Sequence, residues 1–202
     1  MIPIQRLFAN NRCWAQEQAR RDVAFFERLS AIQTPDYLWI GCADSRVPAN
    51  EIVGLVPGEL LVHRNVANVV APGDSNCEAV IQYAVEVLKV QHIILCGHYG
   101  CGGVEAALGA VLHGPLERWL QHVRDVRLAH AMELDRLTDR AAQWGRLCEL
   151  NVMDQVQAAC RVPAVREAWH RGQSLTIHGW IYNLRDGLLR DLDVSASRID
   201  MT

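Results

Sequence analysis

The segment GCADSR at residues 41–46 places a thiol, a carboxylate and a guanidinium at alternate positions. If the backbone stays extended there, the period of two sends Cys42, Asp44 and Arg46 to one side of the chain. The three groups would then share a pocket, in which the guanidinium keeps the carboxylate ionised. The segment therefore predicts a reactive site. The simpler alternative for Asp44 and Arg46 is a partly buried salt bridge beneath a turn.

A second segment, GHYGCGG at residues 97–103, contains an imidazole and a thiol three positions apart. Its glycines permit a tight turn in which His98 and Cys101 point at a common centre. Two thiolates and one imidazole select zinc over Mg²⁺ or Ca²⁺, and three protein ligands leave a fourth tetrahedral position open for catalysis. We therefore predict one Zn²⁺ per chain, held by Cys42, His98 and Cys101.

Composition narrows the class of protein. The 202 residues are 50% apolar and carry a net charge of -3, which predicts a single domain at residues 1–202 that binds no nucleic acid and no membrane. The N-terminus lacks the apolar core of an export signal, so we expect a cytoplasmic location. Seven cysteines then do not predict a disulfide framework. Five of them are expected to be buried apolar side chains: Cys13, Cys77, Cys96, Cys148 and Cys160.

The elements that must position these groups follow an α/β pattern. Short apolar runs predict buried strands at residues 37–40, 60–63, 93–96 and 175–178. Between the second and third runs, CEAVIQYAVEVLKV predicts a helix with Asn76 as its N-cap and with Val80, Tyr83, Ala84, Val87 and Leu88 on one face. A strand, a helix and a strand imply a parallel crossover. Because ligands bind at the carboxyl ends of parallel strands, the two reactive segments are expected to meet.

The rest of the chain is mostly helical in pattern. Residues 4–31 predict two amphipathic helices, and residues 115–162 predict helix with a break at Thr138 and Asp139. Arg185-Asp186-Gly187 predicts the turn of a terminal hairpin. The resulting fold class is α/β.

The motifs CADSRVP, HRNVANVV and HYGCGGV together resemble the β-class carbonic anhydrases. Further segments that are similar to the family, among them LWIGC, LCELNV and HGWIYNLRDGLLRDLDV, extend the likeness over most of the chain. The resemblance implies a zinc enzyme that interconverts CO2 and bicarbonate. It also implies a four-stranded parallel sheet with an antiparallel edge strand, flanking helices, and assembly as a homodimer or homotetramer. The N-terminal helical arm, residues 1–35, would pack on a partner subunit.

The resemblance also implies roles for single residues. The catalytic dyad of the family corresponds to Asp44 and Arg46. The substrate pocket corresponds to Gln33, Val66, Tyr83, Gly102 and Gly103. One position departs from the pattern, because Leu61 stands where many members have Phe.

Within the β class, the chain resembles a bacterial-type subgroup with a non-catalytic bicarbonate site. The matching residues are Trp39, Arg64 and Tyr182. A guanidinium, an indole N–H and a hydroxyl can all donate hydrogen bonds to a small planar anion. In that subgroup the bound anion favours a closed state, in which the residue matching Asp44 becomes the fourth zinc ligand.

The mechanism follows from the chemistry of the predicted ligands. Zinc lowers the pKa of bound water, and Asp44, held by Arg46, would orient the resulting zinc-bound hydroxide toward CO2. Two alternatives stay open. Asp44 could close the fourth position permanently, which would make the protein a non-catalytic zinc scaffold, or the substrate could be COS or CS2.

Overall fold

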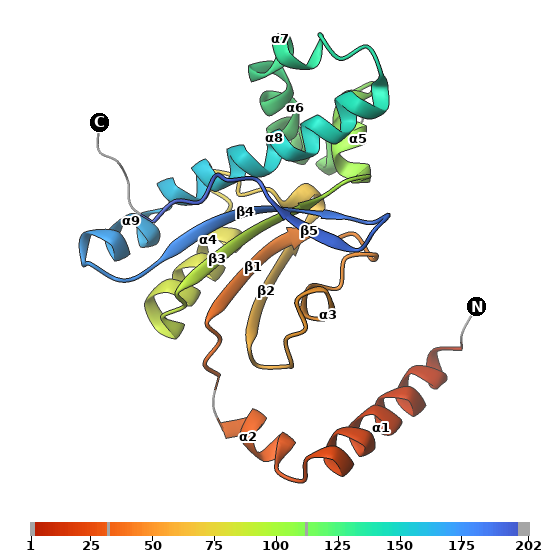
Figure 1. The fold of residues 1–202 in the computed structure, drawn as a ribbon, viewed down its shortest axis with the longest axis vertical. Coiled ribbons are helices and arrows are strands. Elements are labelled where there is room, and N and C mark those ends of the chain that lie inside the picture. The colour runs from red at the N-terminus through yellow and green to blue at the C-terminus, as the bar shows by residue number, and fades with distance from the viewer. Residues whose placement is uncertain (1–2, 32, 112, 198–202) are drawn as a thin grey trace. The chain divides into compact units, whose positions relative to one another are not determined.

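The computed structural model describes residues 3–31, 33–111 and 113–197 and divides the chain into two compact units, Met1–Thr34 and Pro35–Thr202 (Figure 1). The first unit contains helices α1 (Ile4–Arg21) and α2 (Phe25–Ala31). The prediction of two helices in residues 4–31 is thus confirmed. Neither helix has a buried residue. Among the described part of this unit, apolar side chains such as Ile4, Leu7 and Phe8 are exposed.

The second unit is built on one five-stranded sheet. Its strands are β1 (Tyr37–Cys42), β2 (Leu60–Asn65), β3 (His92–His98), β4 (Thr176–Asn183) and β5 (Leu188–Asp191). The order is β2-β1-β3-β4-β5, in which β5 alone is antiparallel to its neighbour. The predicted fold class and strand directions are confirmed. Three strands continue past the glycine at which their apolar run stops, because backbone pairing needs no apolar side chain.

Helices connect and cover the strands. They are α3 (Ala49–Val53), α4 (Ser75–Gln82), α5 (Gly102–Leu108), α6 (Pro115–Ala129), α7 (Ala131–Leu134), α8 (Arg140–Arg161) and α9 (Pro163–His170). The break at Thr138 and Asp139 is confirmed, since the Asp139 side chain accepts from the Ala142 amide and caps α8. The predicted N-cap Asn76 is wrong: Asp74 caps α4 by accepting from the Asn76 amide.

The predicted face of the α4 segment is only partly correct, because Ala84 is buried and Val80 and Leu88 pack against the core, but Tyr83 and Val87 do not. Tyr83 and Val87 are 44% and 62% exposed, whereas Cys77 and Ile81 are fully buried. Helix α4 continues as a π-helical turn over Tyr83–Leu88, whose wider winding changes which side chains face the sheet. The apolar residues of this segment occupy more than one face, so periodicity alone identified only part of the buried face.

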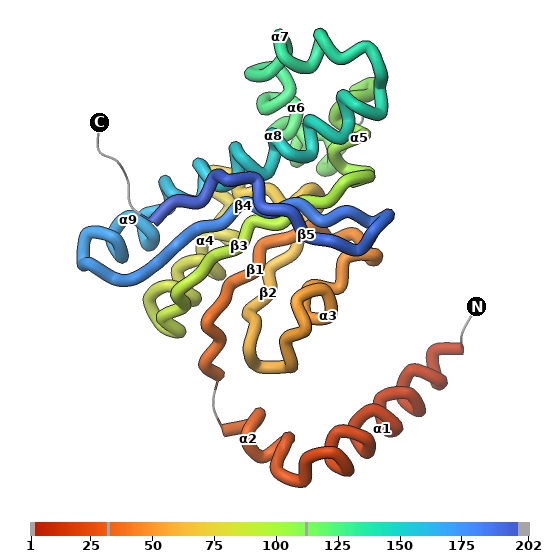
Figure 2. The backbone as a smooth tube through the Cα atoms, viewed as in Figure 1, coloured from red at the N-terminus to blue at the C-terminus, as the bar shows by residue number. Residues whose placement is uncertain are grey.

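The core lies on both faces of the sheet. One face, with Leu38, Ile40 and Leu95, packs against α4, α8 and α9. The other face, with Trp39 and Cys96, packs against Ala49 in α3. Strands β1 and β3 run side by side in the centre, and Figure 2 shows the connections that leave their carboxyl ends. In the described part of the chain, no helix has the length and apolar content needed to cross a membrane.

Candidate metal centre

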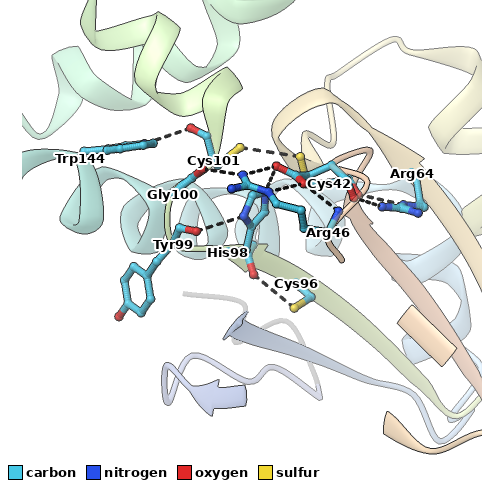
Figure 3. Close-up of polar contacts among 11 residues, drawn as sticks. Cys42, Arg46, Arg64, Cys96, His98, Tyr99, Gly100, Cys101 and Trp144 are labelled. Atoms are coloured by element: carbon cyan, nitrogen blue, oxygen red, sulfur yellow. Dashed lines mark hydrogen bonds and ion pairs between the residues drawn. The ribbon is translucent and has the colours of Figure 1, made fainter. Parts of the chain in front are cut away.

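The two reactive segments meet because of the sheet register. Gly41 in β1 pairs with Cys96 in β3, so Cys42 and His98 leave the sheet at the same edge. The turn after β3 brings Cys101 back toward Cys42 (Figure 3). Ligand atoms of Cys42, His98 and Cys101 all lie within 4.8 Å of one another, and among the described residues this is the one such group. All three side chains are buried.

The geometry of this group fits zinc. The two sulfur atoms are 3.7 Å apart, close to the ~3.8 Å expected for two thiolates on a tetrahedral zinc ion with Zn–S bonds of about 2.3 Å. His98 Nδ1 lies 3.1 Å from the Tyr99 carbonyl oxygen, to which it can donate. That bond leaves Nε2 with a free lone pair, and within the described structure this buried atom has no hydrogen-bond partner.

The electrostatics of the two thiols are unequal. The adjacent Cys101 thiol, together with the nearby backbone amides of Ala67 and Asp44, lowers the pKa of Cys42. The pKa of Cys101 is raised by its contact with Cys42 and by burial, because a second negative charge beside the first is unfavourable. The lowered pKa favours the thiolate form of Cys42. A bound divalent cation would stabilise the thiolate form of Cys101 as well.

Asp44 and Arg46 form a bidentate ion pair at the rim of this group. Arg46 Nε donates to Asp44 Oδ1 at 2.9 Å and Nη2 donates to Oδ2 at 2.6 Å. These bonds hold the pKa of Asp44 well below its usual range. Asp44 Oδ2 also lies 3.7 Å from His98 Nε2, so the carboxylate faces the ligand group. Arg46 Nη2 further donates to the Gly100 carbonyl and joins the two reactive segments.

The expected extended backbone at this point is wrong. Strand β1 ends at Cys42, and the Val47 amide donates to the Asp44 carbonyl across a turn. The turn still pairs the two side chains, because the Arg46 amide donates to Asp44 Oδ1. The pairing therefore comes from turn chemistry and not from strand periodicity.

The structure places the predicted pocket residues in different settings. Gly102 and Gly103 begin α5 directly after Cys101. Val66 lies beside Gly103, where an added Cβ would stand 2.7 Å from Val66 Cγ1. Tyr83 is exposed beyond α4, and Gln33 is an exposed residue of the first unit. The residues near the ligand group thus include Val66 and the two glycines. Leu61 packs on the sheet face that carries Leu38, Ile40 and Leu95.

Trp39, Arg64 and Tyr182 lie on β1, β2 and β4, and the register puts them on one face of the sheet. Trp39 is fully buried, and its Nε1 occupies the space in which a Cβ on Gly41 would stand. Arg64 donates from Nε to the Cys42 carbonyl at 2.9 Å and from Nη2 to the Asp44 carbonyl. Its guanidinium therefore holds the backbone of the segment that carries the ion pair.

Sequence reasoning missed several backbone contributors. The site is supported by three backbone groups: the Ala67 amide, the Gly100 carbonyl and the Cys101 carbonyl. Every residue has such groups, so the sequence does not show which of them contact the site. Ala67 has a left-handed φ of 64°, which only the folded structure reveals. Of the other cysteines, Cys77, Cys96 and Cys148 are buried as expected, but Cys13 is exposed and Cys160 half-buried.

Comparison with known proteins gives a consistent result. A family model described as carbonic anhydrase matches residues 37–189. A carbonic anhydrase of Emericella nidulans is 47% identical over 94% of this chain and 83% of its own. The structure of a Coccomyxa β-carbonic anhydrase in complex with acetazolamide has a TM-score of 0.94 at 39% identity, covering 98% of this chain and 90% of its own. A tetrameric β-carbonic anhydrase from Sordaria macrospora has a TM-score of 0.91 at 41% identity, covering 95% and 98%. The chain belongs to the β-class carbonic anhydrase family.

Proposed function

We propose that this chain interconverts CO2 and bicarbonate at a zinc ion held by Cys42, His98 and Cys101. The observation that carries the proposal is a buried group of two sulfurs and one free imidazole nitrogen, with an ionised carboxylate facing it. When bound, zinc supplies the activation of water that CO2 hydration requires. The family membership supports this activity.

Asp44 is proposed to orient the reacting water. A carboxylate held ionised by Arg46 can only accept hydrogen bonds, so it fixes the direction of the water O–H and turns a lone pair toward CO2. Arg46 occupies both carboxylate oxygens. This arrangement disfavours the scaffold alternative, in which Asp44 would bind the metal permanently.

Metal analysis combined with stopped-flow CO2 hydration tests the proposal. Cys42→Ser and Cys101→Ser are expected to lose zinc and activity together, because a hydroxyl is a far poorer anionic ligand than a thiolate. Cys77→Ser is the matched control: this thiol is buried in α4, and burial raises its pKa to about 12. Full zinc occupancy in either ligand variant would overturn the site. If zinc-loaded wild-type protein hydrates no CO2 but hydrolyses COS or CS2, the substrate is COS or CS2 and not CO2.

A homo-oligomer is proposed as the active form, with the arm of residues 1–35 packing on a partner subunit. The arm has no buried residue in its helices, and the Sordaria relative is tetrameric. Gln33 and Tyr83 are exposed in the single chain, which suits pocket residues that act across a subunit boundary. The cytoplasmic location stays a prediction, which cell fractionation would test.

A bicarbonate switch at Trp39, Arg64 and Tyr182 is proposed for the same enzyme, as in the bacterial-type subgroup. Arg64 holds the carbonyls of Cys42 and Asp44, so an anion that attracts this guanidinium would loosen the turn that keeps Asp44 against Arg46. A freed Asp44 is then available as a fourth zinc ligand. A ligand shifts such an equilibrium only by its difference in affinity for the two states.

Inhibition kinetics test the switch. Bicarbonate is expected to inhibit beyond product competition, and Trp39→Phe or Tyr182→Phe is expected to weaken that inhibition with zinc retained. Trp180→Phe, on the same sheet face, is the control. Purely competitive inhibition, unchanged in both variants, would exclude the switch.

A further inference from the structure

One face of helix α8 carries four residues that contact the segments beneath the metal centre. Trp144, Cys148, Asn151 and Gln155 follow one another at steps of four, three and four, which places them in one row on a helix. Cys148, Asn151 and Gln155 are buried, and Trp144 is half-buried. We call these four residues the α8 row.

The first half of the row contacts the turn that carries Cys101. Trp144 Nε1 donates to the Cys101 carbonyl at 3.0 Å, as Figure 3 shows. Cys148 is buried and lies in the same hydrophobic cluster as Cys101. Neither residue is among the three ligands.

The second half of the row contacts the segment that supports Cys42. Asn151 Nδ2 donates to the Ala67 carbonyl at 2.8 Å, and Gln155 Oε1 accepts from the Val70 amide at 2.7 Å. Gln155 Nε2 also donates to Asn151 Oδ1 at 3.2 Å, which fixes the orientation of both amides.

The segment at Ala67 needs this support. Ala67 and the next residue, Asn68, both have a left-handed backbone, with φ of 64° and 49°. Non-glycine residues hold that conformation only where the surroundings impose it. Ala67 lies with Cys42 in one buried cluster, and Asn65, two residues before Ala67, pairs with Cys42 in the sheet. Asn151 therefore acts on Cys42 through the backbone of residues 65–67.

We propose that the α8 row is a positioning device that fixes the two thiolate ligands, which come from different strand ends, at the separation zinc requires. The inference rests on the zinc site proposed above and deepens it. Loss of one contact in the row leaves all three ligands present but less fixed before the metal binds. Outer contacts of this kind typically change metal affinity by about 10- to 100-fold.

Trp144→Phe gives the sharpest test, because it removes the indole N–H and keeps an aromatic ring. Its matched control is Trp169→Phe in α9, where the indole N–H donates to the Leu175 carbonyl at 2.8 Å. Both variants lose one indole-to-carbonyl bond, but only the first bond ends at a ligand residue. Two readouts are used: the zinc release rate into an excess of a chromophoric chelator, and the thiolate-to-metal charge-transfer bands of the Co²⁺-loaded protein.

Trp144→Phe is expected to release zinc about tenfold faster and to shift the Co²⁺ bands, whereas Trp169→Phe matches the wild type. Asn151→Leu is expected to act in the same direction through Cys42. If Asn151→Leu does not fold, Trp144→Phe decides alone. Wild-type protein without zinc would contradict the proposed function itself. Wild-type protein with zinc, together with equal release rates and spectra in both Trp variants, would overturn the positioning role alone.

Discussion

The chemistry of the site depends on a few residues whose types were visible in the sequence. Two thiolates and an imidazole are ligands that suit zinc, and glycines beside them indicated turns rather than core. The structure brings Cys42, His98 and Cys101 together. The role of the α8 row could not be predicted from the sequence, because most of its partners are backbone groups. Cys148 looked like any buried cysteine, and Asn151 like any polar residue of a long helix.

The ion pair gives a prediction at the residue scale. Asp44→Asn and Arg46→Ala are expected to retain zinc, because neither residue is one of the three ligands. CO2 hydration should fall on the order of 100-fold in each, since the variants lose the ionised acceptor or the group that holds it. Zinc analysis and stopped-flow rates measure the two effects separately. Arg171→Ala, which removes an exposed partner of Glu167, is the control. Wild-type rates in both dyad variants would reduce the pair to a structural salt bridge.

A histidine pair predicts how stability depends on pH. His92 Nδ1 and His178 Nε2 are 3.1 Å apart, and His178 Nδ1 lies 3.2 Å from Ser195 Oγ. Burial and the neighbouring His92 lower the pKa of His178, although Asp191 acts in the opposite direction. Below the unfolded pKa of about 6.5, the unfolded chain takes up a proton that the folded chain does not. Stability should therefore fall as the pH drops from that value toward the folded pKa.

Thermal unfolding at pH 7.5 and pH 5.5 measures this effect. His178→Gln removes the titrating group while it keeps a polar side chain, so the loss of Tm between the two conditions should shrink. An equal loss of Tm in wild type and variant would assign the pH dependence to other groups. His63 is one such group, because burial lowers its pKa as well.

At the scale of elements, the sequence predicted the strands and their directions better than the helices. Buried strands between helices have a clear signature of short apolar runs. The segment after Asn76 shows the limit, because its apolar residues lie on more than one side and a π-helical turn changes the winding at Tyr83. The short helix α5 was missed entirely, since glycines 102 and 103 indicated a turn.

The contact between β4 and α8 gives a prediction at this scale. A Cβ at Gly179 would lie 2.5 Å from Val194 Cγ2 and 3.0 Å from Val156 Cγ2. Gly179→Ala is therefore expected to destabilise the protein by about 1–3 kcal/mol through overpacking. Urea unfolding measures the change. Gly145→Ala is the matched control, because its Cβ would lie 3.8 Å from the Tyr99 ring in ordinary contact and alanine favours the helix. Equal stability of the two variants would show that the contact can relax.

At the scale of the whole molecule, the exposed apolar side chains of α1 bear on the proposed assembly. Ile4, Leu7 and Phe8 are 64%, 51% and 67% exposed on one side of α1. Within the described part of the first unit this apolar side is uncovered, which is typical of an interface. The sequence predicted the two helices of the arm from their period, but a partner surface has no comparable pattern.

Charge on the apolar side of α1 should therefore break the assembly. The double variant Leu7→Asp with Phe8→Asp is expected to lower the molar mass measured by light scattering after gel filtration. Gln5→Asp with Gln16→Asp adds the same charge to the polar side and should keep the wild-type mass. Unchanged mass in the first variant would show that the arm does not hold the oligomer together.

The register of β1 against β3 makes metal content a measure of correct folding. Gly41 must stand beside Cys96 for Cys42 and His98 to reach the same edge, and a slip of one residue would turn Cys42 to the opposite sheet face. Zinc uptake during refolding is thus expected to follow the pairing of these two central strands, because the ligand group cannot form before they have paired in this register.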